Sequence, residues 1–206
     1  MRTVTFAGYC WEVHPSKTRR HPGPNLFSDS EENVRVDKDG LHLRITQREN
    51  GWHCSEVSLD TPLGFGTYSF TLSSDVATFD QHTVFGAFLY ENDSQEIDIE
   101  ISPSMVGRNK IQFAIQPWLR WNHRKRINAA PHGATTCSLT WLPTSVIFAA
   151  HHSGEAAPGA SWTYKKSAIH SQKKAKFMLN LWLYKGAQVS APEHIVISAF
   201  SFTPAG

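Results

Sequence analysis

The stretch Ser94-Gln95-Glu96-Ile97-Asp98-Ile99-Glu100-Ile101-Ser102 alternates three carboxylates with three isoleucines. Alternation at period two predicts a β-strand, because successive side chains of a strand point to opposite faces of its sheet. Glu96, Asp98 and Glu100 would therefore share one face. The three isoleucines would share the other face, where β-branched side chains suit a pleated, packed surface.

An unbroken acidic face is a poor device for stability, since neighbouring like charges repel and raise each other's pKa. It suits a pair of catalytic carboxylates, one ionised to attack and the other protonated to donate. The Cα atoms of Glu96 and Glu100 would lie roughly 13 Å apart along a strand. Two side chains leaning together can close this to the ~5–5.5 Å of a retaining pair in glycoside hydrolysis. Asp98, between them, would hydrogen-bond to both, and the alternative is a solvated strand face without chemistry.

Short runs with strand character fill most of the remaining chain, with almost no helical periodicity. Asp37-Lys38-Asp39-Gly40 predicts a hairpin turn, and residues 83–90, apolar throughout, predict a central strand covered on both faces. Further strands are expected at 34–36, 41–46, 68–73, 110–116, 138–141, 146–148, 176–182 and 196–202. About a dozen short strands without helices predict an all-β fold, a two-sheet antiparallel β-jelly roll sandwich. We expect Arg124-Lys125-Arg126 to belong to a loop.

Length and charge narrow the classes of protein further. A chain of 206 residues is expected to form one domain, residues 1–206, with ample core. The net charge of +2, without a long run of one sign, argues against a nucleic-acid partner. No apolar run is long enough to span a bilayer, so no membrane partner is expected, and the protein is expected to be a monomer. The first residues lack the apolar region of a signal peptide, so either the protein is cytosolic or a signal was removed.

The acidic stretch resembles the E-I-D-I-E signature of glycoside hydrolase family 16, at Glu96 to Glu100. The resemblance extends in the same order over most of the chain, to the landmarks Gly23-Pro24-Asn25, Cys54-Ser55-Glu56, Gly64-Phe65-Gly66-Thr67-Tyr68, Phe88-Leu89-Tyr90, Trp141-Leu142-Pro143 and Asn180-Leu181-Trp182. It implies a concanavalin A-like jelly roll and a retaining endo-β-glycanase acting on a polysaccharide or oligosaccharide. In that family the first Glu is the nucleophile, the Asp assists it and the last Glu is the acid/base, which are Glu96, Asp98 and Glu100 here.

Departures from the family pattern concern sugar contacts more than the reacting groups. Ser94 stands where an aromatic residue is common, and Ser58 stands where a basic residue is common. Ala114 replaces an asparagine that is frequent on the strand after the acidic one. These departures put the substrate in doubt more than the reaction.

Seven further residues are candidate sugar contacts. Trp118, Trp121 and His123 lie in a polar and aromatic segment after a strand expected beside the acidic one, and exposed indoles suit the C–H face of a pyranose. The resemblance adds Glu56, Tyr90, Asn180 and Trp182. For the tryptophans the alternative is core packing, and for Glu56 it is an ordinary surface position.

No metal ligand set or cofactor motif is present in the sequence. His151 and His152 are adjacent, so on a strand they would point to opposite faces, and we expect surface histidines. No cofactor is expected to be required, and a structural calcium ion is allowed by the resemblance alone.

Three cysteines cannot all pair within the chain. A bridge between Cys10 and Cys54 and free, buried thiols are both open, and free thiols are the expectation.

Two classes of function follow. The complete acidic triad favours an enzyme, whereas the altered sugar contacts favour a carbohydrate-binding, lectin-like domain on the same fold. A structural β-sandwich with a merely wet acidic face is a third, weaker reading. Fold alone cannot separate them, because function depends on the site.

Overall fold

The computed structural model describes residues 1–103, 110–128, 133–152, 158–166 and 174–206. Strands are the main regular structure of these residues, and the remaining regular elements are two single 3₁₀ turns, η1 (Val76–Thr78) and η2 (Tyr184–Gly186). The strands are β1 (Thr3–Phe6), β2 (Tyr9–Val13), β3 (Leu26–Phe27), β4 (Val34–Asp37), β5 (Gly40–Arg48), β6 (Gly51–Leu59), β7 (Gly66–Leu72), β8 (Thr83–Asn92), β9 (Gln95–Ser102), β10 (Lys110–Ile115), β11 (Arg124–Ile127), β12 (Thr135–Leu142), β13 (Ser145–His152), β14 (Ala160–Lys165), β15 (Lys176–Leu183) and β16 (Glu193–Pro204).

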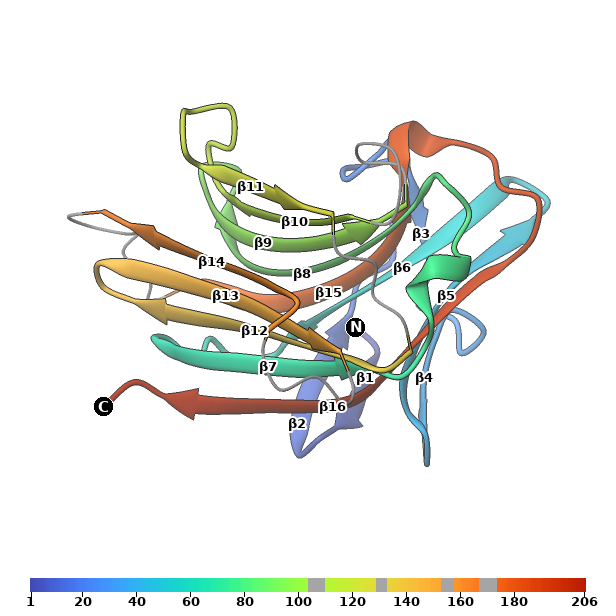
Figure 1. Ribbon diagram of the computed structural model, residues 1–206. Helices are drawn as coiled ribbons and strands as arrows, with labels where there is room; N and C mark the ends of the chain where they lie inside the picture. The colour runs from blue at the N-terminus through green and yellow to red at the C-terminus, as the bar shows by residue number, and fades with distance from the viewer. Residues whose placement is uncertain (104–109, 129–132, 153–157, 167–173) are drawn as a thin grey trace.

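The strands form two layers joined through β5 and β6. The ladder runs β11-β10-β9-β8-β15-β6 and then β5-β16-β7-β12-β13-β14, with β1 and β2 continuing from β6. All pairings are antiparallel except that of β3 with β6. Figure 1 shows β8 to β11 and β15 curving above β7, β12, β13 and β16. The predicted all-β, two-sheet antiparallel jelly roll is therefore confirmed.

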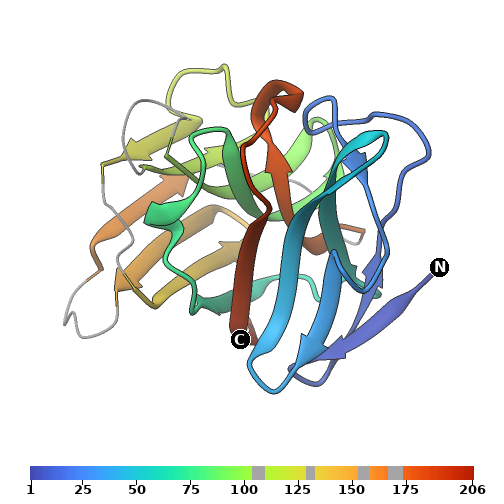
Figure 2. The same cartoon turned by 90° about the vertical axis from the view of Figure 1, so that its right-hand side faces the viewer.

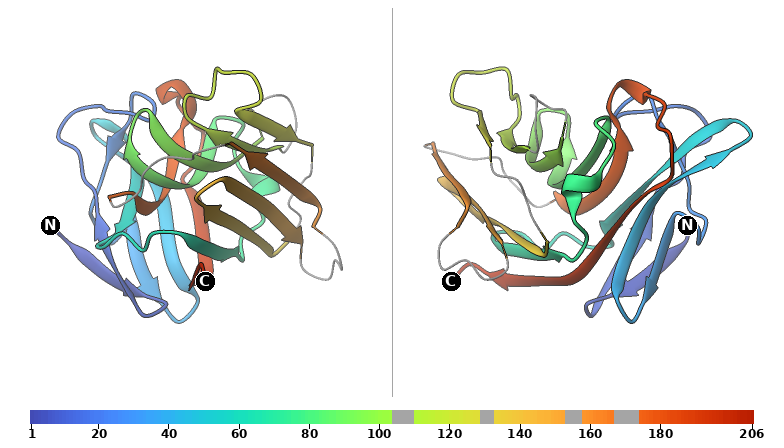
Figure 3. Two further views of the ribbon diagram at one scale, coloured as in Figure 1. Left: turned by 90° about the vertical axis from the view of Figure 1, so that its left-hand side faces the viewer. Right: turned by 45° about the vertical axis from the view of Figure 1, so that its right-hand side comes forward.

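The upper layer is concave on the side that faces away from the lower layer. Two further views show this curvature and the lower layer beneath it (Figure 3). The N-terminal strands β1, β2, β4 and β5, blue to cyan, gather on one side of the molecule (Figure 2). We call the outward side of β6, β15, β8, β9, β10 and β11 the concave face.

Alternating side chains from both layers fill the space between them. Tyr68 on β7 stacks on Phe177 on β15, with ring centroids 5.1 Å apart. Phe113 on β10 stacks in the same way on Phe148 on β13, at 4.9 Å. Each of these pairs joins the upper layer to the lower one, and all four rings are at most 1% exposed. Aromatic pairs of this kind contribute beyond the area that they bury.

Most of the strand predictions are confirmed. The hairpin turn at 37–40 joins β4 to β5, and residues 83–89 on the central strand β8 are buried on both faces. The prediction of a loop at Arg124-Lys125-Arg126 was wrong, because these residues begin β11, which pairs with β10. Sequence reasoning also missed β14, although its run Ala160–Lys165 alternates apolar with polar residues and buries Ala160 and Tyr164.

The cysteines are free. Cys54 and Cys137 are buried and Cys10 is partly exposed, so no bridge joins Cys10 to Cys54. Burial raises the pKa of the Cys54 and Cys137 thiols to about 12. Both thiols are therefore protonated and inert near neutral pH, as expected for small apolar core residues.

Replacing Phe113 by alanine tests the contact between the layers. The change removes a ring at a fully buried position, so we expect unfolding free energy to fall by about 3–5 kcal/mol in a denaturant titration. The control is Ile147→Ala on β13, because Ile147 is 40% exposed, and its loss should stay near or below about 1 kcal/mol. Similar losses for the two variants would contradict this packing.

Candidate active site

Strand β9 has the two faces that its alternation predicts. Its three isoleucines are at most 2% exposed and pack into the core between the layers. Glu96, Asp98 and Glu100 alternate with them and therefore lie on the concave face. Ladders with β8 on one side and β10 on the other fix the backbone of β9 along its length. The three carboxylates are thus held in one line by the centre of a sheet.

A row of polar side chains crosses the concave face through Glu100. In register, Glu100 lies between Gly86 on β8 and Gln112 on β10. On the other side of Gly86 the row continues to Asn180 on β15 and Glu56 on β6. Residues opposite one another in a ladder share a face of the sheet. The structure therefore brings the predicted contacts Glu56 and Asn180 onto the same face as the three carboxylates.

Glu56 and Asn180 are tied together beside the reacting groups. The Asn180 amide donates from Nδ2 to Glu56 Oε2 at 3.2 Å, and Arg20 donates from Nη2 to Glu56 Oε1 at 2.9 Å. Asn180 Oδ1 is buried and accepts no hydrogen bond within the described part of the chain. A Cβ atom on Gly86 would lie 2.4 Å from this oxygen, so any other residue at position 86 would displace the Asn180 amide. An orphaned acceptor next to Glu100 is suited to a hydroxyl donor from a ligand.

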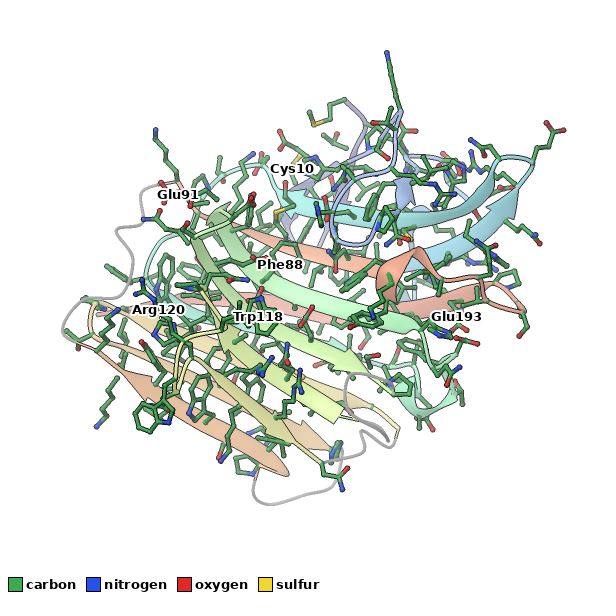
Figure 4. The ribbon with its side chains drawn as sticks, turned by 90° about the horizontal axis from the view of Figure 1, so that it is seen from above. Cys10, Phe88, Glu91, Trp118, Arg120 and Glu193 are labelled. Atoms are coloured by element: carbon green, nitrogen blue, oxygen red, sulfur yellow. The ribbon has the colours of Figure 1, made fainter. Side chains whose placement is uncertain are left out.

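The other two carboxylates have more apolar neighbours. Asp98 lies between Phe88 on β8 and Ala114 on β10, and is only 8% exposed. Glu96 lies opposite Tyr90. Figure 4 looks onto this face and labels Phe88 near its centre. These neighbours remove water from the carboxylates, which favours their protonated forms.

Hydrogen bonds distinguish the carboxylates from one another. Gln112 donates from Nε2 to Glu100 Oε2 at 2.7 Å. Glu96 accepts hydrogen bonds from the side chains of Asp98 and Gln116, and both lower its pKa. Asp98 must hold a proton to donate, and the bond to Glu96 raises its pKa. Glu96 is therefore the carboxylate that this arrangement stabilises in its ionised form.

Burial dominates the pKa values of all three groups. It raises the pKa of Glu96 to about 6 and that of Glu100 to about 7. Burial, followed by the charges of both glutamates, places the pKa of Asp98 well above its ordinary value. The pKa of Glu96 thus lies below that of Glu100, so Glu96 is the first of the two to ionise as the pH rises. Two carboxylates with their pKa values pushed apart can divide the roles of base or nucleophile and acid.

Two of the other predicted contacts also belong to the concave face. Trp182 follows Asn180 by two positions on β15 and so lies on the same face, although it is largely buried. Tyr90 is half-buried, and its hydroxyl donates to Asp93 Oδ1 at 2.8 Å. Tyr90 is therefore the more accessible of the two rings.

Trp118 and Trp121 are exposed in the loop after β10. Trp118 is 39% exposed and Trp121 is 92% exposed. The guanidinium carbon of Arg124 lies 4.7 Å from the centre of a Trp118 ring. Trp118 is labelled near the middle of Figure 4, seen from above the concave face. The prediction of exposed indoles near the acidic strand thus agrees with the structure, whereas their contact with sugar stays a prediction.

The structure buries His123, and its contact with sugar stays a prediction. The ring is 7% exposed and lies at the end of β10. Its Nδ1 lies 3.2 Å from the Ile115 carbonyl oxygen and its Nε2 lies 2.9 Å from the Tyr164 hydroxyl. Both ring nitrogens are therefore satisfied inside the protein. The polar segment around it concealed the fact that this one side chain turns towards β14.

Sequence reasoning missed the residues that support the carboxylates from β10 and β11. Gln112 and Gln116 hydrogen-bond to Glu100 and Glu96, and Arg126 donates from Nε to Gln112 Oε1 at 2.8 Å. The period-two alternation that identified the acidic strand could also have identified these two glutamines. Gln112 and Gln116 stand on the same face of the run 110–116, between apolar residues that face the core.

Neither a metal site nor a membrane span is found in the described ranges. No group of three or more His, Cys, Asp or Glu side chains there could hold a metal ion. No described helix is long and apolar enough to cross a bilayer.

Comparison with solved structures shows which known proteins share this fold. No family model and no curated protein sequence matches the chain. Among solved structures it is similar to a Bacillus licheniformis β-glucanase, with TM-score 0.72 and 20% identity over 95% of this chain and 92% of that one. A prokaryotic β-1,3-1,4-glucanase (lichenase) from a mouse hindgut metagenome gives TM-score 0.72 and 16% identity over 95% and 93%. A pseudo β-1,3-glucanase of Mycobacterium tuberculosis gives 0.71 and 17% over 95% and 91%. The chain therefore has the fold of the β-glucanases.

The raised pKa of Glu100 predicts how the site affects stability. The folded state favours protonated Glu100, which therefore contributes to the free energy of unfolding. This contribution is fully present below about pH 4.5 and is lost as the pH rises through about 7. Glu100→Gln removes the ionisable group with little change of shape. As the pH rises from 5 to 8, we expect the free energy of unfolding of the variant to increase relative to that of the parent by about 1–3 kcal/mol.

Thermal unfolding at the two pH values measures this gain. Glu49→Gln is the matched control, because Glu49 is exposed in a turn. A Glu100→Gln difference from the parent that is the same at both pH values would contradict the raised pKa.

Proposed function

We propose that the protein is a retaining endo-β-glycanase that cleaves a polysaccharide by double displacement. The observation that carries the proposal is the line of Glu96, Asp98 and Glu100 on one buried strand face, with the pKa of Glu96 below that of Glu100. Two glutamates four residues apart on a strand can approach the ~5–5.5 Å separation of a retaining pair. The ionised member is the nucleophile and the protonated member is the acid.

The first displacement uses both glutamates at once. A Glu96 oxygen attacks the anomeric carbon and forms an ester bond to the sugar. The bond from that carbon to the glycosidic oxygen breaks, and Glu100 gives its proton to the departing oxygen. Glu100 is then ionised. Gln112, which donates to Glu100 Oε2, stabilises this charged form.

The second displacement returns the site to its starting state. Ionised Glu100 takes a proton from a water molecule, whose oxygen attacks the anomeric carbon and releases Glu96 as a carboxylate. Asp98 donates its hydrogen bond to Glu96 in the free site and therefore favours the carboxylate as nucleophile and leaving group. The product keeps the β configuration, because each displacement inverts the anomeric carbon once.

The comparisons support the general class of activity. The similar folds carry the names β-glucanase and lichenase, which are glycoside hydrolases. Asn180, with its free Oδ1, and Glu56 add polar contacts for sugar hydroxyls in the same row as Glu100. Hydrogen bonds of this kind orient a sugar while the carboxylates act on it.

A lectin-like function without turnover is the second candidate. A similar structure is named a pseudo β-1,3-glucanase. In this chain the Glu56 carboxylate is also occupied by Arg20, at 2.9 Å. Such a protein would bind a glycan on the concave face and release no new reducing ends.

Incubation with a panel of β-glycans separates the two candidates. We expect the parent to release reducing ends from at least one of them. Glu96→Gln and Glu100→Gln should each lower kcat about 1000-fold or more on that polymer, because both act in the transition state. Glu49→Gln controls for the loss of a carboxylate and should keep the parent rate. Glycan binding without any release of reducing ends would favour the lectin.

The pH dependence of turnover tests the division of roles. We expect a bell-shaped kcat/KM profile with its acidic limb near pH 6, from Glu96, and its basic limb near pH 7, from Glu100. Gln112→Leu removes the hydrogen bond that lowers the pKa of Glu100. The basic limb should therefore move to higher pH while the acidic limb stays in place. A shift of the acidic limb alone would reverse the assignment.

A further inference from the structure

Four described cationic side chains on or beside the concave face differ in their partners. Arg20 contacts Glu56 at 2.9 Å, and Lys176 contacts Glu12 at 2.7 Å. Arg124 and Arg126, both on β11, form no ion pair with any carboxylate in the described ranges. The first two cations are neutralised within the protein. The two on β11 leave a positive charge at the surface.

Register places both of these arginines beside the reacting groups. Arg126 lies opposite Gln112, which lies opposite Glu100. Arg124 lies opposite Ala114, which lies opposite Asp98. Both side chains therefore leave β11 on the concave face, two strand spacings, or roughly 10 Å, from β9. A sugar chain that crosses the sheet at Glu100 would pass them within one or two units of the cleaved bond.

The two guanidinium groups are held in place by neutral partners. Arg126 donates through Nε to Gln112 Oε1 at 2.8 Å, and the same amide donates to Glu100. Arg124 lies over a Trp118 ring at 4.7 Å. Neither contact uses the terminal N–H groups, which have no acceptor within the described residues. A fixed guanidinium with free N–H groups is prepared for bidentate hydrogen bonds.

The two charges also repel each other. They are two residues apart on one strand face, and the Arg124 charge adds to burial in lowering the pKa of Arg126. The nearest carboxylate in the row, Glu100, is separated from Arg126 by the Gln112 amide. An anion bound between the two arginines would remove the repulsion and satisfy the N–H groups.

We propose that Arg124 and Arg126 form a subsite for an anionic substituent on the sugar chain, a sulfate ester or a uronic acid carboxylate. The inference rests on the proposed function only in taking the ligand to be the same glycan. Each substituent offers two oxygens that can accept hydrogen bonds from one guanidinium. Trp118 supplies an apolar ring next to the subsite for the sugar that carries the charge.

The surrounding charges favour a sparsely charged sugar over nucleic acid. A nucleic acid carries a phosphate at every unit and needs a continuous basic surface. On the concave face Glu96, Asp98 and Glu100 lie on β9, separated from the two arginines on β11 only by β10. A closely spaced polyanion would meet these carboxylates, whereas one anionic group at the arginines would not.

Binding of matched oligosaccharides tests the subsite. One pair of probes is a sulfated β-galactan oligosaccharide and the same oligosaccharide after desulfation. The other pair is a β-glucan oligosaccharide carrying glucuronate and its carboxyl-reduced form. Affinities are measured by calorimetric titration of the full chain carrying Glu96→Gln, so that no probe is cleaved, with Arg124→Gln, Arg126→Gln or Lys125→Gln added. Lys125 is the matched control, because it lies between the arginines, is exposed and points to the other face of β11.

We expect the charged member of at least one pair to bind about tenfold or more tightly than its neutral partner at low salt. Arg124→Gln and Arg126→Gln should each remove most of this preference, and Lys125→Gln should keep it. The preference should also fall as sodium chloride rises from about 0.05 to about 0.5 M. The pair of probes that shows the effect identifies the substituent as sulfate or carboxylate.

Equal affinity for charged and neutral members in both pairs, including no measurable binding of any probe, overturns the subsite. A preference that survives in both arginine variants, or that Lys125→Gln also removes, overturns it as well. Far-UV circular dichroism checks that each variant is folded, and Arg124→Lys, which keeps the charge, should retain part of the preference. The readout does not involve turnover, so it is independent of whether the protein hydrolyses any glycan.

Discussion

Burial of three carboxylates on one face of β9 is the constraint on which the rest of the site depends. Alternate residues of a strand are only about 7 Å apart, so three ionised groups would repel one another strongly. The fold lowers this cost by keeping protons on Asp98 and, near neutral pH, on Glu100. Glu96 accepts hydrogen bonds from Asp98 and Gln116, which lower its pKa and favour its charged form. Packing of the isoleucines on the opposite face keeps the strand in register.

The register of the strands also aligns the neighbours of these carboxylates in rows across the sheet. Because facing residues in a ladder share a side, Glu100 defines a row that reaches Glu56 in one direction and Arg126 in the other. Glycine at position 86 lets the Asn180 amide approach within this row. Cations towards β6 are neutralised by carboxylates, and those on β11 are held by an amide and an indole. The concave face is therefore electrostatically asymmetric about the carboxylates.

Much of this arrangement could be predicted from the sequence, because period-two alternation fixes which side chains share a face. That rule identified the acidic strand and most of the sheet. It failed for Arg124-Lys125-Arg126, since three cations conceal the strand character of β11, whose position at the edge of the layer allows charged residues on both faces. It could not show that His123 is buried, because the direction of a loop side chain depends on a distant partner, Tyr164. No local pattern could show that Arg20 occupies the Glu56 carboxylate, because the two residues are 36 positions apart.

The assignment of Glu96 as nucleophile is tested most directly by the stereochemistry of azide products. With an aryl oligosaccharide substrate, Glu96→Ala leaves room for azide at the face that Glu96 would attack, and proton NMR should show an α-glycosyl azide. Glu100→Ala still forms the ester at Glu96, which azide then displaces, so the product should be a β-glycosyl azide. Exchanged anomers would assign the opposite roles to the two glutamates, and the absence of azide products from both variants would contradict covalent catalysis at this site.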